Sequence, residues 1–288
     1  AYDEWVSDND YMLFNVCDEK GKNHKKAILA SKRGNVVYRF RVKKRFKNIP
    51  HLFPNENLFD PRKCAVGKTN MLFTTLTFDQ RNYSLYDAYS AAPKEFDKFE
   101  KRLRKKYPLA FIRAWESHKS GYVHVHALIA FKDKEWEVKR HISKKNKGKE
   151  TWRLKDYETK EKEFDALFAP GFVDVQGVIN PRKGLEYILK YITGEKKDGK
   201  LDELTLSLLW LLRKRSYGIS STDLIKICIT HPVSIQLTLD GKEIRVVWTL
   251  LGFVNLKFNG CDDRGPPWEL DLDKIPGLQP RIKHLLEN

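Results

Sequence analysis

The feature that most constrains the fold is a pair of apolar segments that lie only five residues apart in the middle of the chain. Residues Leu109–Glu116 and Tyr122–Phe131 have the composition of β-strands, and the connection between them ends in Gly121. Two strands joined by so short a connection pair antiparallel as a hairpin. The sequence therefore predicts an antiparallel sheet that includes residues 109–131.

Further strands and helices are predicted on both sides of this hairpin. Residues Met71–Phe78 and Phe172–Ile179 have the pattern of strands. One helix is expected to begin at Pro93 and to end before Pro108, and another is expected over residues 181–193. The resulting order, β-α-β-β-β-α, predicts an α+β fold in which helices pack on an antiparallel sheet.

The other segments give weaker signals. The basic and aromatic run Arg39–Lys47 alternates as a strand would. Residues 143–150 have almost no apolar content and are predicted to form a loop. A helix is expected over Leu204–Leu212, and a hairpin over residues 233–250 with its turn at Asp240–Gly241.

The charge of the chain limits the class of partner. Its 54 Lys and Arg residues against 38 Asp and Glu give a net charge of +16. Such an excess favours a polyanionic partner, although a merely basic soluble protein would also show it. The longest apolar run, Leu206–Leu212, is far shorter than the roughly 20 residues of a membrane span. Residues 1–5 lack a secretory signal pattern, so we expect a cytoplasmic protein with no membrane partner. The missing initiator Met indicates a trimmed chain or a piece of a longer one.

His124 and His126 alternate within the second strand of the hairpin. Side chains two residues apart on a strand point to the same face, so both imidazoles can bind one ion. A single histidine in an apolar strand is usually a satisfied core residue, but two on one face each need a polar partner. If residue 116 pairs with residue 122, Glu116 lies on this face as the third ligand; the alternative is an ion pair between Glu116 and Lys119.

Two imidazoles and one carboxylate suit Mn²⁺, Mg²⁺, Zn²⁺ or Fe²⁺, and the sequence does not choose among them. The same set occurs in non-haem iron oxygenases, whose all-β folds are disfavoured here by the two long helices.

The predicted helix 181–193 adds a second chemical group. Tyr187, Lys190 and Tyr191 lie at i, i+3 and i+4 and so share one face. A tyrosine phenol has an ordinary pKa near 10 and becomes a good nucleophile when cations favour its phenolate. A divalent ion and Lys190 would both do so, and the ion would also neutralise a phosphodiester under attack. The alternative is an amphipathic helix whose tyrosines only pack on the core.

Three blocks, in this order, resemble the motifs of HUH endonucleases of the rolling-circle replication initiator (Rep) type. Residues 74–78, Thr-Thr-Leu-Thr-Phe, are similar to the first motif, and residues 121–129, Gly-Tyr-Val-His-Val-His-Ala-Leu-Ile, to the second. Residues 187–191, Tyr-Ile-Leu-Lys-Tyr, are similar to the third. The resemblance covers about residues 70–195. Conjugative relaxases share the chemistry but place their tyrosine before the histidines.

This resemblance implies a fold, an activity and a set of partners. The fold is an RRM-like antiparallel sheet with flanking helices. Glu116, His124 and His126 would hold a divalent ion, Mn²⁺ or Mg²⁺. Tyr187 would cut one strand of a single-stranded or hairpin origin, keep the 5′-phosphate as phosphotyrosine, free a 3′-OH, and later rejoin the strand. The replicon would be a plasmid or a virus of a prokaryotic host.

The second tyrosine departs from the family pattern. Family members with two active tyrosines usually have the sequence Y-x-x-K-Y-x-x-K, and here Gly194 stands three residues after Tyr191. Tyr187 is therefore the expected main nucleophile, and Tyr191 is either a second nucleophile or a residue that stacks on the substrate. The candidate residues for DNA contact are Arg39, Arg41, Lys43, Lys44, Arg45, Thr75, Thr77, Lys144 and Lys145.

The expected organisation has three parts: an N-terminal extension (1–65), an HUH catalytic domain (66–196) and a C-terminal α+β extension (197–288). Gly67-Lys68-Thr69 is no phosphate loop, because the required upstream glycine is Arg62 and a strand follows. A helicase and a polymerase are therefore expected as separate partners. Two alternatives remain: a transposase with the same chemistry, and a non-catalytic RRM-like module that stacks bases on Phe73 and Phe131.

Overall fold

The computed structural model describes residues 1–8, 10–18, 20–46, 65–143, 149–156, 162–195, 202–220, 236–239, 242–245, 247–255 and 269–274. The chain divides into two compact units. We call Val42–Cys228 the central unit, and Ala1–Arg41 together with Ile229–Asn288 the terminal unit. The three-part division drawn from the sequence stays a prediction.

The central unit is built on a five-stranded antiparallel sheet in the order β10-β5-β6-β4-β9. Its strands are β4 (Met71–Phe78), β5 (Leu109–Ser117), β6 (Val123–Phe131), β9 (Gly171–Gly177) and β10 (Tyr217–Ile219). The predicted hairpin is β5–β6, and the predicted α+β class is confirmed. The register differs from the one assumed, because Glu116 pairs with His124 and not with residue 122. A shift of two residues keeps every side chain on its face, so the prediction for Glu116 is unaffected.

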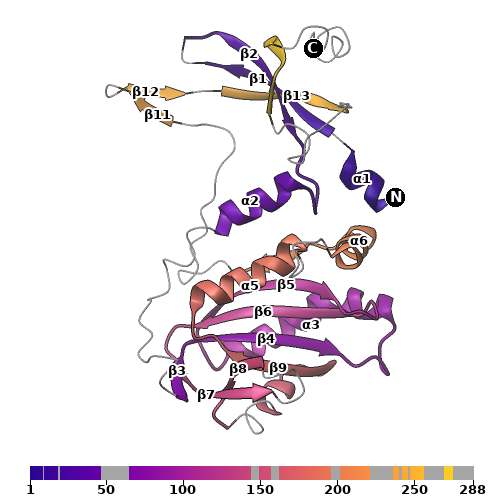
Figure 1. Cartoon of the computed structure of the whole chain (residues 1–288), viewed down its shortest axis with the longest axis vertical. Coiled ribbons are helices and arrows are strands. Elements are labelled where there is room, and N and C mark those ends of the chain that lie inside the picture. Colours follow the sequence, from indigo (N-terminus) through magenta and orange to yellow (C-terminus); the bar gives the residue numbers. More distant parts are fainter. Residues whose placement is uncertain are drawn as a thin grey trace. The chain divides into compact units, whose positions relative to one another are not determined.

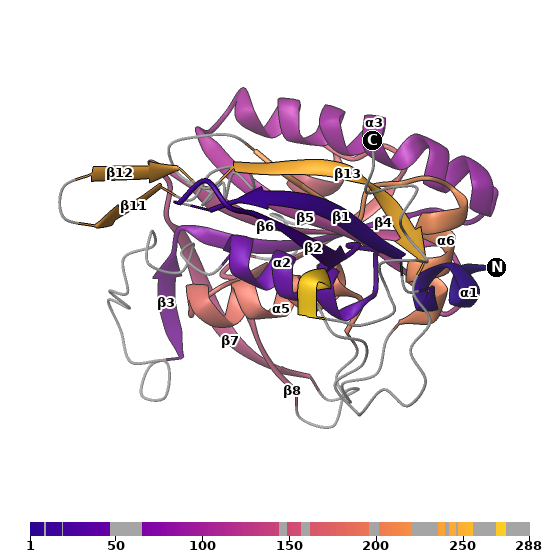
Figure 2. The same cartoon turned by 90° about the horizontal axis from the view of Figure 1, so that it is seen from above.

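Two helices cover opposite faces of this sheet (Figures 1 and 2). Helix α3 (Leu85–Arg104) packs Phe96 and Phe99 against the face that carries Val123 and Val125. Helix α5 (Pro181–Thr193) lies on the other face, where the side chains of His124 and His126 emerge. Helix α6 (Glu203–Leu211) follows α5 and packs near β5.

The prediction that the first of these helices begins at Pro93 is wrong. Helix α3 begins eight residues earlier, where the side chain of Ser84 accepts a hydrogen bond from the backbone N–H of Asp87. Ala88, Tyr89 and Ala92 extend the buried stripe through this first part. Their burial outweighs the one backbone hydrogen bond that a proline inside a helix removes.

The basic run 39–47 was also predicted wrongly. As far as residue 46 it belongs to helix α2 (Val36–Phe46) and not to a strand. Asn35 starts the helix by accepting a hydrogen bond from the backbone N–H of Tyr38, and Val37, Val42 and Phe46 are buried at a helical spacing. The alternation of basic and apolar residues fits both periods over so short a run.

A second, smaller sheet of the central unit has the order β3-β7-β8. Its strands are β3 (Val66–Thr69), β7 (Trp136–Ser143) and β8 (Lys149–Leu154). Part of the loop predicted at 143–150 is therefore strand, and residues 144–148 lie outside the described residues.

The terminal unit brings together segments from both ends of the chain. Strands β1 (Asp10–Cys17), β2 (Asn23–Leu29), β13 (Val247–Asn255) and β14 (Glu269–Asp271) form an antiparallel sheet in the order β13-β1-β2-β14. Helix α1 (Tyr2–Ser7) precedes it, and a short 3₁₀ turn, Leu272–Lys274, follows β14. Strands β11 (Gln236–Leu239) and β12 (Lys242–Arg245) pair with each other as predicted, although the turn residues lie outside the described part.

The positive charge is distributed unequally between the two units. The central unit has 39 Lys and Arg residues against 24 Asp and Glu, hence +15. The terminal unit has 15 against 14, hence +1. A surface that binds a polyanion is therefore expected on the central unit. Within the described residues, no helix is both long and apolar enough to cross a membrane.

Candidate active site

Three side chains meet on the α5 face of the central sheet. Glu116 on β5 and His124 and His126 on β6 each offer a ligand atom, and these atoms all lie within 4.8 Å of one another. In the described part of the chain no other group of three such residues does so. The antiparallel pairing of β5 with β6 causes this, because it sets Glu116 directly opposite His124 and beside His126. The cluster can hold a metal ion.

Hydrogen bonds on both ring nitrogens fix the imidazole of His126. Its Nε2 lies 2.7 Å from Oε2 of Glu116, and its Nδ1 lies 3.1 Å from Oγ1 of Thr75 on β4. A hydroxyl both donates and accepts, so Thr75 suits either tautomer. With Nδ1–H donated to Thr75, the lone pair of Nε2 is free for an ion next to Glu116. Such a partner behind a histidine ligand typically orients it.

His124 is held in its neutral form. Burial, together with the neighbouring imidazoles of His126 and His118, lowers the pKa of His124 to about 4. The ring of His118 stacks on that of His124 with centroids 5.2 Å apart. A neutral imidazole is the form that binds metal, so His124 needs no deprotonation at neutral pH.

Helix α5 places both tyrosines beside this cluster. The ring of Tyr191 stacks almost parallel on that of His126, with centroids 4.0 Å apart. Its hydroxyl donates a hydrogen bond to Oη of Tyr187 at 2.7 Å. Burial, then the contact with Tyr187, raises the pKa of Tyr191 far above its ordinary value. Phe73 on β4 supports the group from the sheet, with its ring 5.6 Å from His126 and 5.1 Å from Tyr187.

Two cavities adjoin the cluster. A small one of about 190 Å³ is lined by Glu116, Tyr187, Lys190 and Tyr191, among others. A larger one of about 760 Å³ contains His124 in its wall. Its lining residues are Thr75, Thr77, Phe78, Asp79, Gln80, Arg81, Asn82, His118, His124, Ala169, Pro170, Gly171, Phe172 and Asp174. The structure thus brings the predicted ligands, tyrosines and lysine together, with open space on two sides.

The predicted DNA contacts are only partly gathered here. Thr75 and Thr77 line the larger cavity, whereas the basic candidates from Arg39 to Arg45 lie on helix α2. On that helix Lys43 forms an ion pair with Glu195 at 2.8 Å, and Arg45 donates to the hydroxyl of Tyr217. Lys144 and Lys145 lie outside the described residues.

The aromatic residues of the non-catalytic alternative are not available for stacking. Phe73 is only 7% exposed and Phe131 only 1%. Phe172 on β9, which the sequence interpretation missed, is 55% exposed and lines the larger cavity. Its signal was an aromatic residue between polar neighbours at the start of a strand, and this becomes informative only once β9 is known to pair with β4.

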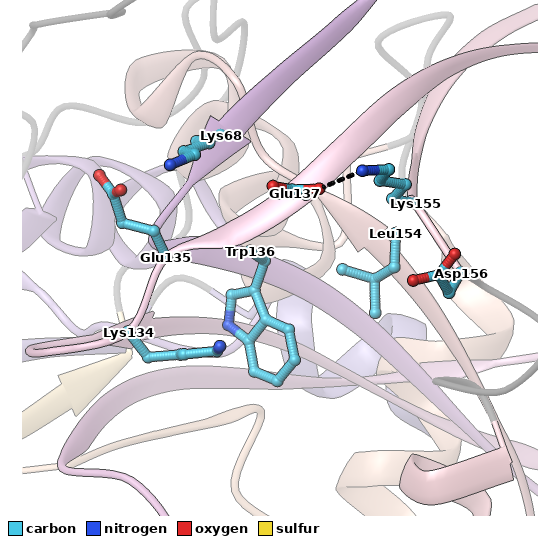
Figure 3. Close-up of a pocket in the computed structure, with 8 residues that line it drawn as sticks. All are labelled: Lys68, Lys134, Glu135, Trp136, Glu137, Leu154, Lys155 and Asp156. Carbon is cyan, nitrogen blue, oxygen red and sulfur yellow. Dashed lines mark hydrogen bonds and ion pairs between the residues drawn. The ribbon is translucent and has the colours of Figure 1, made fainter.

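A third cavity, of about 310 Å³, shares no residue with the other two (Figure 3). In it Lys155 forms an ion pair with Glu137 at 2.7 Å, and the ammonium of Lys134 lies over the buried indole of Trp136. The charged side chains of its wall balance: Lys68, Lys134 and Lys155 against Glu135, Glu137 and Asp156. This cavity has no part in the candidate site.

Comparison with known families agrees with this geometry. Residues 71–196 match a family model for replication-associated proteins of the ORF2 type. Over these residues the chain is related to replication-associated proteins. The matched segment contains all three motifs, so the predicted resemblance to Rep-type initiators is confirmed there. No curated protein and no solved structure matches the chain.

Proposed function

We propose that this protein initiates rolling-circle replication by nicking and rejoining single-stranded DNA at the origin of a plasmid or viral replicon. The observation that carries the proposal is the meeting of Tyr187 with the Glu116–His124–His126 cluster inside the segment that matches replication-associated proteins. A nucleophile and a metal-ligand set on adjacent elements are what tyrosine-dependent strand cleavage needs.

The residues fit a divalent ion. Two imidazole nitrogens and one carboxylate oxygen are accepted by Mn²⁺ and Mg²⁺, and the three protein ligands leave coordination positions for substrate. When bound, the ion would supply Lewis-acid stabilisation of charge on a scissile phosphate. The chain's own contribution is a neutral His124, a His126 oriented by Thr75, and a carboxylate next to both.

The side chains of α5 carry the proposed reaction. The Oη of Tyr187, a residue that is 36% exposed, attacks the phosphorus and loses its proton. The new P–Oη bond replaces the P–O3′ bond, so DNA remains on the protein as 5′-phosphotyrosine and a 3′-OH is released. Lys190 lines the same cavity and offers a positive charge to the reacting phosphate. Rejoining is the reverse, with the 3′-OH as nucleophile and the phenolate of Tyr187 as leaving group.

The first test uses the whole chain and a labelled library of single-stranded oligonucleotides. It is incubated with Mn²⁺, with Mg²⁺ or with EDTA, and covalent adducts are resolved on a denaturing gel. The proposal predicts an adduct with metal and none with EDTA. Tight binding of DNA without an adduct under any metal would contradict it and support a non-catalytic module. A helicase and a polymerase are proposed to act as separate proteins.

DNA binding by the central unit is expected to depend steeply on salt. If about eight of its basic side chains contact phosphates, the log–log slope of affinity against salt should be about −6 to −7. The measurement is fluorescence anisotropy of a labelled oligonucleotide without metal, over a series of salt concentrations. A flat response would show that the charge of +15 is only solvated.

Phe172 is expected to stack on a base of the bound strand. Its exposed ring lies beside the metal-ligand cluster in the larger cavity. Stacking of a base on an aromatic side chain contributes about 1–3 kcal/mol, so Phe172→Ala should weaken oligonucleotide binding about 5- to 100-fold. The matched control is Phe40→Ala, which removes a similarly exposed ring from helix α2. Equal effects of the two changes would exclude a specific role for Phe172.

A further inference from the structure

Tyr191 differs from Tyr187 in its surroundings although both lie on one face of α5. Its ring is stacked on the imidazole of His126, and its hydroxyl donates to the oxygen of Tyr187. We propose that Tyr191 is a positioning residue for Tyr187 and not a second nucleophile. This inference rests on the proposed function and assigns the tyrosine role that the sequence left open.

The end of helix α5 removes the partner that a second nucleophile would need. Tyr187 has Lys190 one turn further on, in the same cavity. The equivalent position after Tyr191 is Gly194, which ends the helix with a positive φ of 72°. A Cβ there would lie 2.8 Å from the side chain of Leu206. Strain and this clash both disfavour a lysine at position 194, so the local fold excludes a second Tyr-x-x-Lys pair.

The stacked contact restricts Tyr191 further. With centroids 4.0 Å apart and planes 18° from parallel, the ring covers one face of His126. To reach a phosphate as Tyr187 does, Tyr191 would have to leave this contact and uncover a metal-ligand candidate. Tyr187 is exposed, and its Oη is an acceptor in the bond between the two phenols.

The donated hydrogen bond gives Tyr191 a definite effect on the reaction. It holds the attacking oxygen in place during cleavage. In rejoining, the same oxygen leaves with negative charge, which a donor stabilises. Cleavage and rejoining pass through one transition state in opposite directions, so loss of the donor should slow both by a similar factor.

Three substitutions separate the possible roles of Tyr191. Tyr191→Phe keeps the stacked ring and removes only the hydroxyl. Tyr191→Leu removes both. Tyr86→Phe is the control, because Tyr86 is 65% exposed on α3, on the opposite face of the sheet.

The experiment measures single-turnover cleavage and rejoining of an oligonucleotide found in the library, together with Mn²⁺ affinity by calorimetry. We expect Tyr191→Phe to lower both rates about 10- to 100-fold, as for loss of a hydrogen bond to a charged group, with the KM for DNA and the affinity for Mn²⁺ unchanged. Tyr191→Leu should in addition weaken Mn²⁺ binding, and Tyr86→Phe should change nothing.

Contradictory outcomes are equally specific. A second nucleophile would form an adduct of its own, either in Tyr187→Phe or on the wild-type protein that already carries DNA, and Tyr191→Phe would then cleave a first strand at the wild-type rate. Either result would overturn the inference while leaving the proposed function intact. Absence of any adduct from the wild-type protein would overturn the proposed function, and the inference with it.

Discussion

Replacing Tyr187 by phenylalanine is expected to abolish covalent attachment of DNA, with a loss of cleavage of about 10⁴-fold or more. The change removes the only atom that forms the bond to phosphorus in the proposed reaction. It leaves the aromatic ring that packs on Phe73, so the fold should be preserved. The measurement is the rate of adduct formation on a denaturing gel with Mn²⁺ present.

The control for this prediction is the binding of DNA. Because the phenol hydroxyl contributes little to the basic surface, Tyr187→Phe should bind the oligonucleotide within about twofold of wild type. An adduct that persists at the wild-type rate would place the nucleophile elsewhere. A joint loss of binding and cleavage would indicate a damaged fold, which circular dichroism would detect.

Removal of the metal site should have the second largest effect. Mn²⁺ at about 100 times its Kd should stabilise the wild-type protein by about 2.7 kcal/mol, because the ion binds only the folded site. For a unit of this size that corresponds to a rise in Tm of about 5–10 °C. In His126→Ala both the rise and the DNA adduct should disappear, since one ligand and the stacking partner of Tyr191 are lost.

A conservative variant separates metal binding from packing. Glu116→Gln keeps the shape of the side chain but removes the negative charge beside His126. The Tm without metal should stay within about 1 °C of wild type, whereas the rise with Mn²⁺ should be mostly lost. An unchanged rise in both variants would show that Mn²⁺ binds elsewhere.

The sequence predicted the ligand cluster because strand periodicity alone decides which side chains share a face. Glu116 was expected on the face of His124 and His126 although the assumed pairing was two residues out, since an even shift does not change the face. The shared face of Tyr187, Lys190 and Tyr191 was equally predictable from helical spacing, and all three line one cavity.

What the sequence could not predict depends on contacts between distant segments. The hydrogen bond between Thr75 and His126 requires the pairing of β4 with β6, and the stack of Tyr191 on His126 requires the docking of α5 on the sheet. Strand β1 pairs with β13, more than 200 residues away, and no local pattern encodes such a partner. Strands β7 and β8 were missed because they carry so many charged side chains that they resemble a loop.

The most direct test of the account is to identify the residue that carries the DNA. The adduct formed with Mn²⁺ should be digested with protease and nuclease, and the nucleotide-linked peptide sequenced by mass spectrometry. We predict a single modified peptide, with the 5′-phosphate on Tyr187. A phosphate on Tyr191 or on any other residue, or the absence of an adduct with every metal, would contradict the central claim.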